Sequence, residues 1–231
     1  VKWSGSKRSQ AEEIIKLFPK EINTYYEPFC VCCSVLRRLL SSDIKVNRYV
    51  CSDLNNDLIN LWNMIKENPK YLSDYYSKLW SELNVDDDKE RKKRYFESVR
   101  ERYNKEHKAE DFLFIMRTTT NGMPRYNKDG KFNNSFHVTR NGILPDKLGK
   151  ILLEWSELLN KYNVEFKCCS YEEIKNNDYI AASYSLNPDT SVITDFAVIS
   201  NDFIVKLINT INLIISFNDS HERYLAIVSQ S

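Results

Sequence analysis

An acidic residue at the end of a predicted strand is the first feature of the sequence that could support chemistry. Asp53 directly follows the short strand expected at 48–51, and the preceding strand is expected to end at Phe29. A carboxylate in that place can accept hydrogen bonds from both ribose hydroxyls of a nucleoside, as in dinucleotide-binding folds. The same side chain could instead cap the helix predicted from Asn55 onward. The residues alone leave both roles open.

A second candidate is an arginine in a polar segment that reads as a hairpin with loops. The segment extends to Asn141, contains Asn121-Gly122-Met123-Pro124-Arg125 and holds two of the five glycines in the chain, Gly122 and Gly130. An arginine offers a two-pronged donor that matches the major-groove edge of guanine. The alternative is a turn that merely exposes Arg125 to solvent.

A dense run of charges of both signs extends from Asp86 to Lys108. Within it, Lys92, Lys93 and Arg94 are expected to contact the phosphates of a nucleic acid. Because the run mixes acids and bases, the alternative is a solvated helix with internal ion pairs.

The six cysteines lie close to three predicted strand ends: Cys30, Cys32, Cys33, Cys51, Cys168 and Cys169. A zinc site would explain the clustering, but no histidine lies near these cysteines in the sequence. We therefore expect buried thiols and no bound metal.

Helices and strands alternate in the first part of the chain, which is typical of an α/β sheet with helices packed on it. The expected elements are a helix at 9–18, a strand at 25–29, a helix at 34–40, a strand at 48–51 and a helix at 55–66. Pro19 is expected to end the first helix.

The middle of the chain differs, because it is helical and aromatic and is followed by the polar hairpin segment. We take residues 68–145 as an inserted, mostly helical recognition domain, and residues 1–67 with 146–231 as the core. In the returning core we expect a helix at 148–162, a strand at 164–168, a strand at 178–184, a helix at 203–210 and a strand at 213–217. The inward residues of the 148–162 helix are predicted to be Ile151, Leu152, Trp155 and Leu159.

Composition excludes several classes of protein. The chain has 231 residues, a net charge of +1, and 42% hydrophobic and 28% charged residues, which is a folding composition. No apolar run approaches the roughly 18 residues of a spanning helix. The chain starts without an apolar signal segment, so we expect a cytoplasmic protein that is not secreted.

Several short stretches occur in an order that resembles the DNA adenine methylase family. They are Lys2-Trp3-Ser4-Gly5-Ser6-Lys7, Tyr26-Glu27-Pro28-Phe29, Ser52-Asp53-Leu54-Asn55, Arg125-Tyr126-Asn127 and Val164-Glu165-Phe166 before Tyr171. The resemblance covers nearly the whole chain. It implies a methyltransferase-like, Rossmann-like sheet and transfer of a methyl group from S-adenosylmethionine to adenine in duplex DNA.

The resemblance also implies roles for individual residues. The cofactor would be contacted by Trp3, Lys7, Glu27, Phe29, Asp53 and Tyr171. The hairpin would meet DNA through Asn121, Met123 and Arg125, with Arg125 reading a guanine, and Tyr184 would stack on the flipped target base. From the residues alone, the Lys2-Trp3 pair could also be ordinary packing.

Three departures from the family pattern fall on cofactor or catalytic positions. The glycine-rich turn after Glu-Pro-Phe is replaced by Cys30-Val31-Cys32-Cys33, where a β-branched residue is disfavoured at positive φ. The family's Asp-Pro-Pro-Tyr becomes Ala181-Ala182-Ser183-Tyr184, and Ser170 replaces an acid.

These departures lead us to expect weak cofactor binding and weak or absent methyl transfer, with duplex DNA binding retained. Two other possibilities remain at this point. One is an active methyltransferase with an unusual pocket, and the other is a non-catalytic scaffold that binds a protein partner or a second copy of itself.

Overall fold

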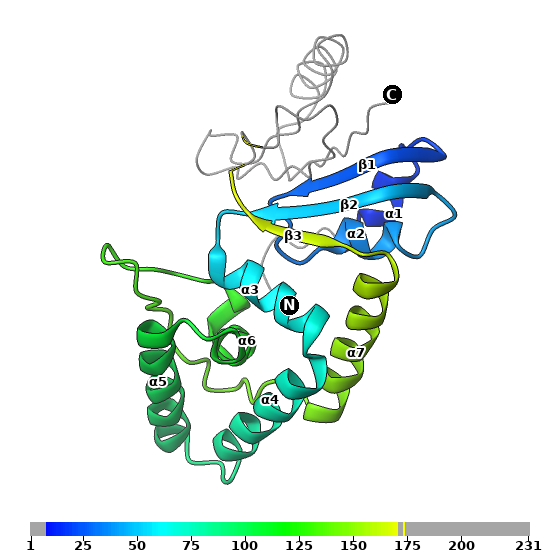
Figure 1. Ribbon diagram of the computed structural model, residues 1–231. Helices are drawn as coiled ribbons and strands as arrows, with labels where there is room; N and C mark the ends of the chain where they lie inside the picture. Colours follow the sequence, from blue (N-terminus) through cyan, green and yellow to red (C-terminus); the bar gives the residue numbers. More distant parts are fainter. Residues whose placement is uncertain (1–7, 171–172, 174–231) are drawn as a thin grey trace, which may run out of the picture. The chain divides into compact units, whose positions relative to one another are not determined.

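The computed structural model describes residues 8–170 and residue 173, which form two compact units (Figure 1). Of the described residues, the helical unit is the continuous segment 55–161, and the sheet unit comprises residues 8–54 together with 162–170 and 173. Trp3, Lys7, Tyr171 and Tyr184, and the elements expected beyond residue 173, lie outside the described residues.

The sheet unit is built on three parallel strands in the order β1 (Glu21–Pro28), β2 (Lys45–Asp53) and β3 (Glu165–Cys168). The short helices α1 (Ala11–Ile15) and α2 (Ser34–Leu39) pack on each other, and α2 connects β1 to β2. Parallel neighbours need such a crossover. The predicted α/β class is therefore confirmed for the described residues.

Both long strands begin earlier than the sequence predicted. In β1, Glu21 and Asn23 are exposed while Ile22 between them is buried, so the first part of the strand alternates between solvent and core, and the strand is buried on both faces from Tyr25 onward. Because Glu21 and Asn23 are polar, the sequence pattern did not indicate the first part of the strand. The buried rings of Tyr25 and Tyr49 then meet edge to face at 6.2 Å.

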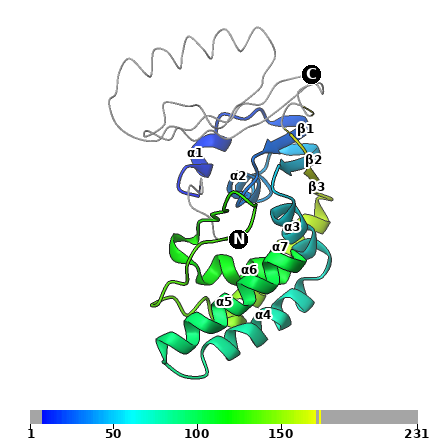
Figure 2. The same cartoon turned by 90° about the vertical axis from the view of Figure 1, so that its left-hand side faces the viewer.

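The helical unit contains α3 (Asn56–Glu67), α4 (Pro69–Leu83), α5 (Lys89–Glu106), α6 (Ala109–Thr118) and α7 (Pro145–Lys161). Figure 1 shows α6 end-on between α3, α4 and α5, and it contacts all three. Its sequence is apolar around most of its circumference, which suits a central helix. Figure 2 shows α5 lying along α6.

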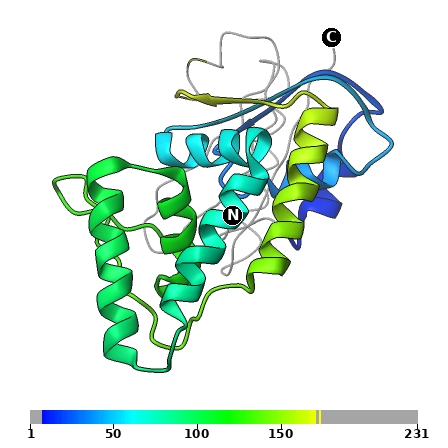
Figure 3. The same cartoon turned by 60° about the horizontal axis from the view of Figure 1, so that its bottom comes forward.

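Helix α7 packs against α3 and α4 (Figure 3). Leu152 and Leu159 are buried as predicted, while Ile151 and Trp155 are only partly buried, and Trp155 meets the Trp62 ring edge to face at 4.9 Å. The compact unit thus includes α3 and α7, which flank the range 68–145. Among the described residues, no helix is long and apolar enough to cross a membrane.

Candidate cofactor site and nucleic-acid interface

The carboxyl ends of the three strands meet at one edge of the sheet unit. Pro28 pairs with Ser52, and Asp53 pairs with Cys168. Beyond the strands, the amide of Cys30 donates to the carbonyl of Ser52 at 3.0 Å. Ligands of open α/β sheets bind at this edge, so we take it as the candidate cofactor site.

The turn between β1 and α2 has the backbone of a glycine-rich loop without its glycines. Phe29, Val31 and Cys33 all adopt left-handed conformations, with φ of 59°, 35° and 49°. Such conformations cost about 1–3 kcal/mol for a residue other than glycine. The expectation that this turn requires positive φ is therefore confirmed, and Val31 is the least suited of the three because its side chain is β-branched.

Glu27 connects β1 to the start of α2. Its Oε2 accepts hydrogen bonds from the Tyr25 hydroxyl at 2.8 Å and from the Leu36 amide at 3.0 Å. The carboxyl is buried, and burial raises its pKa to about 7, against the lowering effect of these two donors. Glu27 therefore stabilises the turn from within the protein core.

Three of the six cysteines are buried at this turn: Cys30 and Cys33 belong to the turn, and Cys51 belongs to β2. Cys33 lies within hydrogen-bonding reach of both Cys30 and Cys51, and burial raises the pKa of all three, to about 12 for Cys30. Metal binding and nucleophilic attack require the thiolate, which these pKa values oppose. Among the described residues, no group of three metal-ligating side chains is placed to hold a metal ion.

The C-x-x-C spacing of Cys30 and Cys33 was a signal in the sequence that these two thiols lie together. The remaining cysteines differ: Cys32 and Cys169 are partly exposed and Cys168 is exposed.

Asp53 is not the cap of α3. That role belongs to Asn55, whose Oδ1 accepts the amide of Leu58 at 3.0 Å. The alternative role for Asp53 is therefore wrong, and its partly exposed carboxylate ends β2 at the candidate site.

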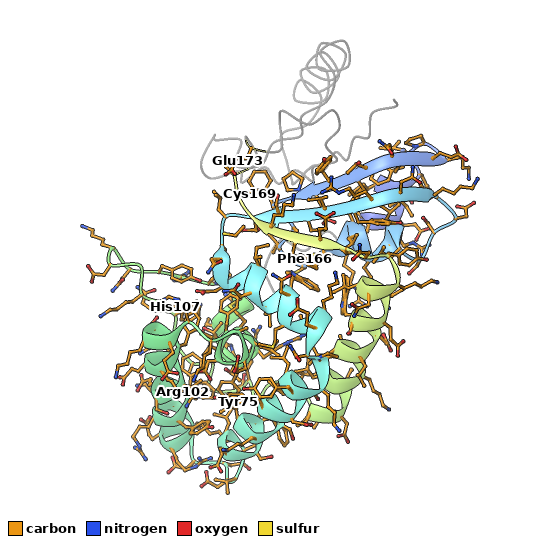
Figure 4. The ribbon with its side chains drawn as sticks, viewed as in Figure 1. Tyr75, Arg102, His107, Phe166, Cys169 and Glu173 are labelled. Atoms are coloured by element: carbon orange, nitrogen blue, oxygen red, sulfur yellow. The ribbon has the colours of Figure 1, made fainter. Side chains whose placement is uncertain are left out.

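An acid that sequence reasoning missed lies next to Ser170. The Ser170 amide donates to Glu173 Oε1 at 3.0 Å, and the Glu173 amide donates to the Ser170 carbonyl at 3.1 Å. Figure 4 shows Glu173 and Cys169 just beyond the end of β3. The Ser-x-x-Glu spacing, which is typical of a capping box, was the available signal. A carboxylate thus stands close to the position where the family pattern has one.

The polar segment of the helical unit forms an antiparallel hairpin, which we call the 119–136 hairpin. Its two arms are bridged at Thr119 with Phe136 and at Tyr126 with Phe132. At the tip, Oδ1 of Asn127 accepts the amides of two later residues, and Gly130 adopts φ of 75°. The predicted hairpin is thereby confirmed, and its tip projects beyond α5 in Figures 1 and 3.

The three candidate DNA-contacting residues of the hairpin differ in their exposure to solvent. Arg125 is exposed, its carbonyl accepts the Asn133 amide at 2.8 Å, and no described residue pairs with its guanidinium. Asn121 is exposed at φ of 57°, whereas Met123 is partly buried and its carbonyl accepts from Asn134 at 2.8 Å. The backbone around Arg125 is therefore held while its side chain faces solvent.

Helix α5 fastens the hairpin along its length. The Asn104 amide bonds both backbone groups of Phe132, and Arg100 donates to the Asn134 carbonyl at 3.1 Å. Lys93 lies seven positions before Arg100 and eleven before Asn104, so these three residues share one face of α5. Arg94 lies about 100° further around the helix.

Lys92 is buried, with only 5% of its side chain exposed, and its ammonium lies 3.1 Å from Asp87 Oδ1 and 3.2 Å from Asn141 Oδ1. This burial argues against the phosphate contact expected for Lys92. Lys93 and Arg94 are both exposed.

Much of the surrounding charge run is neutralised internally. The ion pairs are Arg91 with Asp86, Lys92 with Asp87, Arg102 with Asp111, and Lys108 with Glu106. The solvated-helix alternative therefore describes a large part of this segment.

Comparisons with known proteins point to one family. Residues 3–183 match the family described as D12 class N6 adenine-specific DNA methyltransferase. The chain is 29% identical over 175 residues to the DNA adenine methylase of Haemophilus influenzae, covering 75% of this chain and 57% of that protein.

Two further relatives give the same result. The type II methyltransferase M.MjaIII of Methanocaldococcus jannaschii is 29% identical over 194 residues, covering 79% of this chain and 64% of that protein. The DNA adenine methylase of Vibrio cholerae El Tor is 32% identical over 178 residues, covering 75% and 58%. The chain therefore spans less than two thirds of the length of these relatives.

Proposed function

Because the chain belongs to the D12 class N6 adenine-specific DNA methyltransferase family, whose members use S-adenosylmethionine and have a Rossmann-like fold, we propose that it binds duplex DNA through the 119–136 hairpin. The observation that carries the proposal is Arg125, an exposed arginine on a backbone held by neighbouring hydrogen bonds. Its guanidinium reads one guanine in the major groove, and Asn121 and Met123 flank it.

Phosphate contacts supply the remaining affinity. Lys93 is exposed on the face of α5 that holds the hairpin, and Arg94 is exposed about 100° away. Contacts of this kind are independent of sequence and depend strongly on salt. We therefore assign general affinity to Lys93, with a smaller share for Arg94, and sequence preference to Arg125.

In the sheet unit, the end of β2 suits the ribose of the cofactor, whereas the turn after β1 crowds the ligand. Asp53 at the end of β2 can accept the ribose hydroxyls, and Glu27 and Phe29 border the same edge. In the adjoining turn, the partly exposed side chains of Val31 and Cys32 occupy the surface where a glycine backbone would approach the ligand. S-adenosylmethionine binding is accordingly weak, and the cofactor, when bound, supplies the electrophilic methyl group.

Methyl transfer is reduced further by the residues ahead of Tyr184. The exocyclic amine of adenine is a poor nucleophile, because its lone pair is delocalised into the ring, and it needs a strong acceptor for its hydrogen bond. Ala181, Ala182 and Ser183 provide no carboxylate, and the neutral hydroxyl of Ser183 makes a weaker bond. Tyr184 can stack on a flipped base but does not replace the acceptor.

Two titrations test the proposal. Fluorescence anisotropy with a pool of random duplexes at about 50 mM salt, followed by selection of the bound fraction, should show binding and enrich one guanine-containing site. The loss of that guanine preference in Arg125→Ala, with Lys128→Ala as the control, supports the assignment. Absence of duplex binding by the unaltered chain would refute it.

Calorimetric titration with S-adenosylmethionine tests the cofactor part separately. We expect a dissociation constant weaker than roughly 10 μM, which corresponds to about −7 kcal/mol. Tighter binding would show that the side chains of the 29–33 turn do not crowd the ligand.

A further inference from the structure

Five side chains form a hydrogen-bonded cluster in the helical unit that the proposed function does not use. They come from the start of α3, the end of α5 and the 119–136 hairpin. We call them the Asp57 cluster: Asn55, Asp57, Tyr103, His107 and Tyr126.

Asp57 receives two donors from α5 and its cap. The hydroxyl of Tyr103 donates to Asp57 Oδ2 in a short hydrogen bond, and Nδ1 of His107 lies 3.0 Å from the same oxygen. Only 12% of the Asp57 side chain is exposed, against 52% for His107. Figure 4 shows His107 at the C-terminal end of α5. Asp57 therefore fixes the position of the Tyr103 ring.

Tyr103 is also the residue against which the hairpin packs. Its buried ring meets Phe132 edge to face at 6.0 Å and stacks on Phe112 of α6 at 5.5 Å. Burial and the bond to Asp57 raise the pKa of its hydroxyl, which keeps the hydroxyl protonated as a donor. A shift of Tyr103 would thus remove the support beneath Phe132.

The tip receives a second, direct contact from the start of α3. Nδ2 of Asn55 donates to the Tyr126 hydroxyl at 3.3 Å, and that hydroxyl also lies within hydrogen-bonding reach of Tyr103. The Tyr126 ring meets Phe132 edge to face at 5.8 Å. Since Tyr126 directly follows Arg125, these contacts limit the positions available to the arginine.

We propose that Asp57 is a positioning residue for sequence recognition, which acts through Tyr103 and Tyr126 to hold the hairpin in the conformation that presents Arg125. This inference rests on the proposed function for its link to DNA. Its structural part concerns the order of the hairpin and can be measured without DNA. Asp57 itself touches neither the base nor the phosphates.

Limited trypsin digestion tests the structural part, because Arg125, Lys128 and Lys131 are exposed cleavage sites on the hairpin. Asp57→Ala and Tyr103→Phe should be cut there about tenfold faster than the unaltered chain, since loss of a hydrogen bond to a charged group raises the open population. Asp74→Ala, which removes an exposed carboxylate from α4, is the matched control. Mass spectrometry locates the cuts, and circular dichroism verifies that each variant is folded.

Selection from random duplexes then tests the link to recognition. In Tyr103→Phe and Tyr126→Phe the ratio of affinities for preferred and scrambled duplexes should fall about tenfold, while the salt dependence of non-specific binding stays unchanged. Equal cutting rates in Asp57→Ala, Tyr103→Phe and Asp74→Ala would overturn the positioning role. Faster cutting with unaltered sequence preference would overturn the link to recognition. If the unaltered chain bound no duplex, the proposed function would be refuted, but the digestion would still test whether the Asp57 cluster orders the hairpin.

Discussion

Arg102 holds the fully buried carboxylate of Asp111 with two hydrogen bonds, Nε to Oδ2 at 2.8 Å and Nη2 to Oδ1 at 2.5 Å. The pair joins α5 to the first turn of α6, and Figure 4 shows Tyr75 of α4 on the same side, with its hydroxyl 3.5 Å from Oδ1. A planar two-pronged donor suits a carboxylate that has lost its water. Three helices thus converge on one buried charge.

Removing the guanidinium should therefore be costly. Arg102→Ala leaves Asp111 buried without a compensating charge, and we expect a loss of about 3–5 kcal/mol in the free energy of unfolding. Urea denaturation measures it. Arg94→Ala, on the exposed side of the same helix, should change the value by less than about 0.5 kcal/mol, and a comparable effect of both substitutions would contradict a special role for the pair.

Relief of strain in the 29–33 turn should stabilise the sheet unit. Val31→Gly removes a β-branched side chain from a left-handed conformation, and the gain exceeds the entropic cost of glycine by about 1 kcal/mol. S-adenosylmethionine affinity should rise in the same variant. Val85→Gly, at an exposed position without positive φ, should instead destabilise the chain slightly. Thermal unfolding of both variants distinguishes strain from a general effect of glycine.

Glu27 should impart a pH dependence of a specific sign. Its pKa is about 7 in the folded chain and near 4.5 in the unfolded chain, so the folded state binds the proton more tightly. Stability should therefore be greatest below pH 4.5 as far as this group is concerned, and fall by up to about 3 kcal/mol as the pH rises to about 7. Glu27→Gln, which can still accept both hydrogen bonds, should lack this slope. If stability changed with pH in the same way in the unaltered chain and in Glu27→Gln, a group other than Glu27 would bind the proton.

Lys93 and Arg125 should affect DNA binding in different ways. Lys93→Ala should weaken all duplexes alike and reduce the salt slope by about one. Arg125→Ala should relax the preference for one guanine, by about 1–3 kcal/mol. Anisotropy titrations over a range of salt concentrations separate the two. If Lys93→Ala altered sequence preference instead, the division between general and specific contacts would be wrong.

Methyl transfer should be undetectable on mixed-sequence duplexes, even with protein in excess over DNA, because loss of one preorganised contact costs about 10²–10³ in rate. Transfer of labelled methyl groups measures it. The triple change Ala181→Asp, Ala182→Pro and Ser183→Pro, combined with Val31→Gly, should restore product. Clear single-turnover product from the unaltered chain would show that another carboxylate serves the amine.

Local sequence patterns predicted the helices α2, α3 and α7 close to their observed bounds, because their signals lie within a few residues. The helix predicted at 9–18 is shorter, because α1 covers only Ala11–Ile15 and ends before Pro19 is reached. In the part of the chain expected to be helical and aromatic, Pro69 begins α4, which ends at Leu83. The need for positive φ in the 29–33 turn followed from the resemblance, because the family pattern has a glycine-rich turn there. The role of Asp53 was left open because Asn55, two residues later, is an equally good cap, and only coordinates show which side chain bonds to Leu58.

Contacts between distant residues could not be predicted in this way. Asp57 and Tyr103 are separated by 46 positions, and nothing near either residue marks the other. Lys92 looked like its neighbours Lys93 and Arg94, yet its position on α5 turns it toward Asn141, 49 residues away. Burial of a charged side chain depends on what packs opposite it, which no local pattern contains.

Among the described residues, the helical unit is one uninterrupted stretch from Asn55 to Lys161, whereas the sheet unit is assembled from the segments on either side of it. In genetic terms, Arg125, the Asp57 cluster and the helices of this unit would be inherited as one cassette. A recombination event with two breakpoints, one beside Leu54 and one beside Tyr162, would exchange all of them together. Under the proposed function, such an exchange would alter target preference in a single step and leave β1, β2 and β3 untouched.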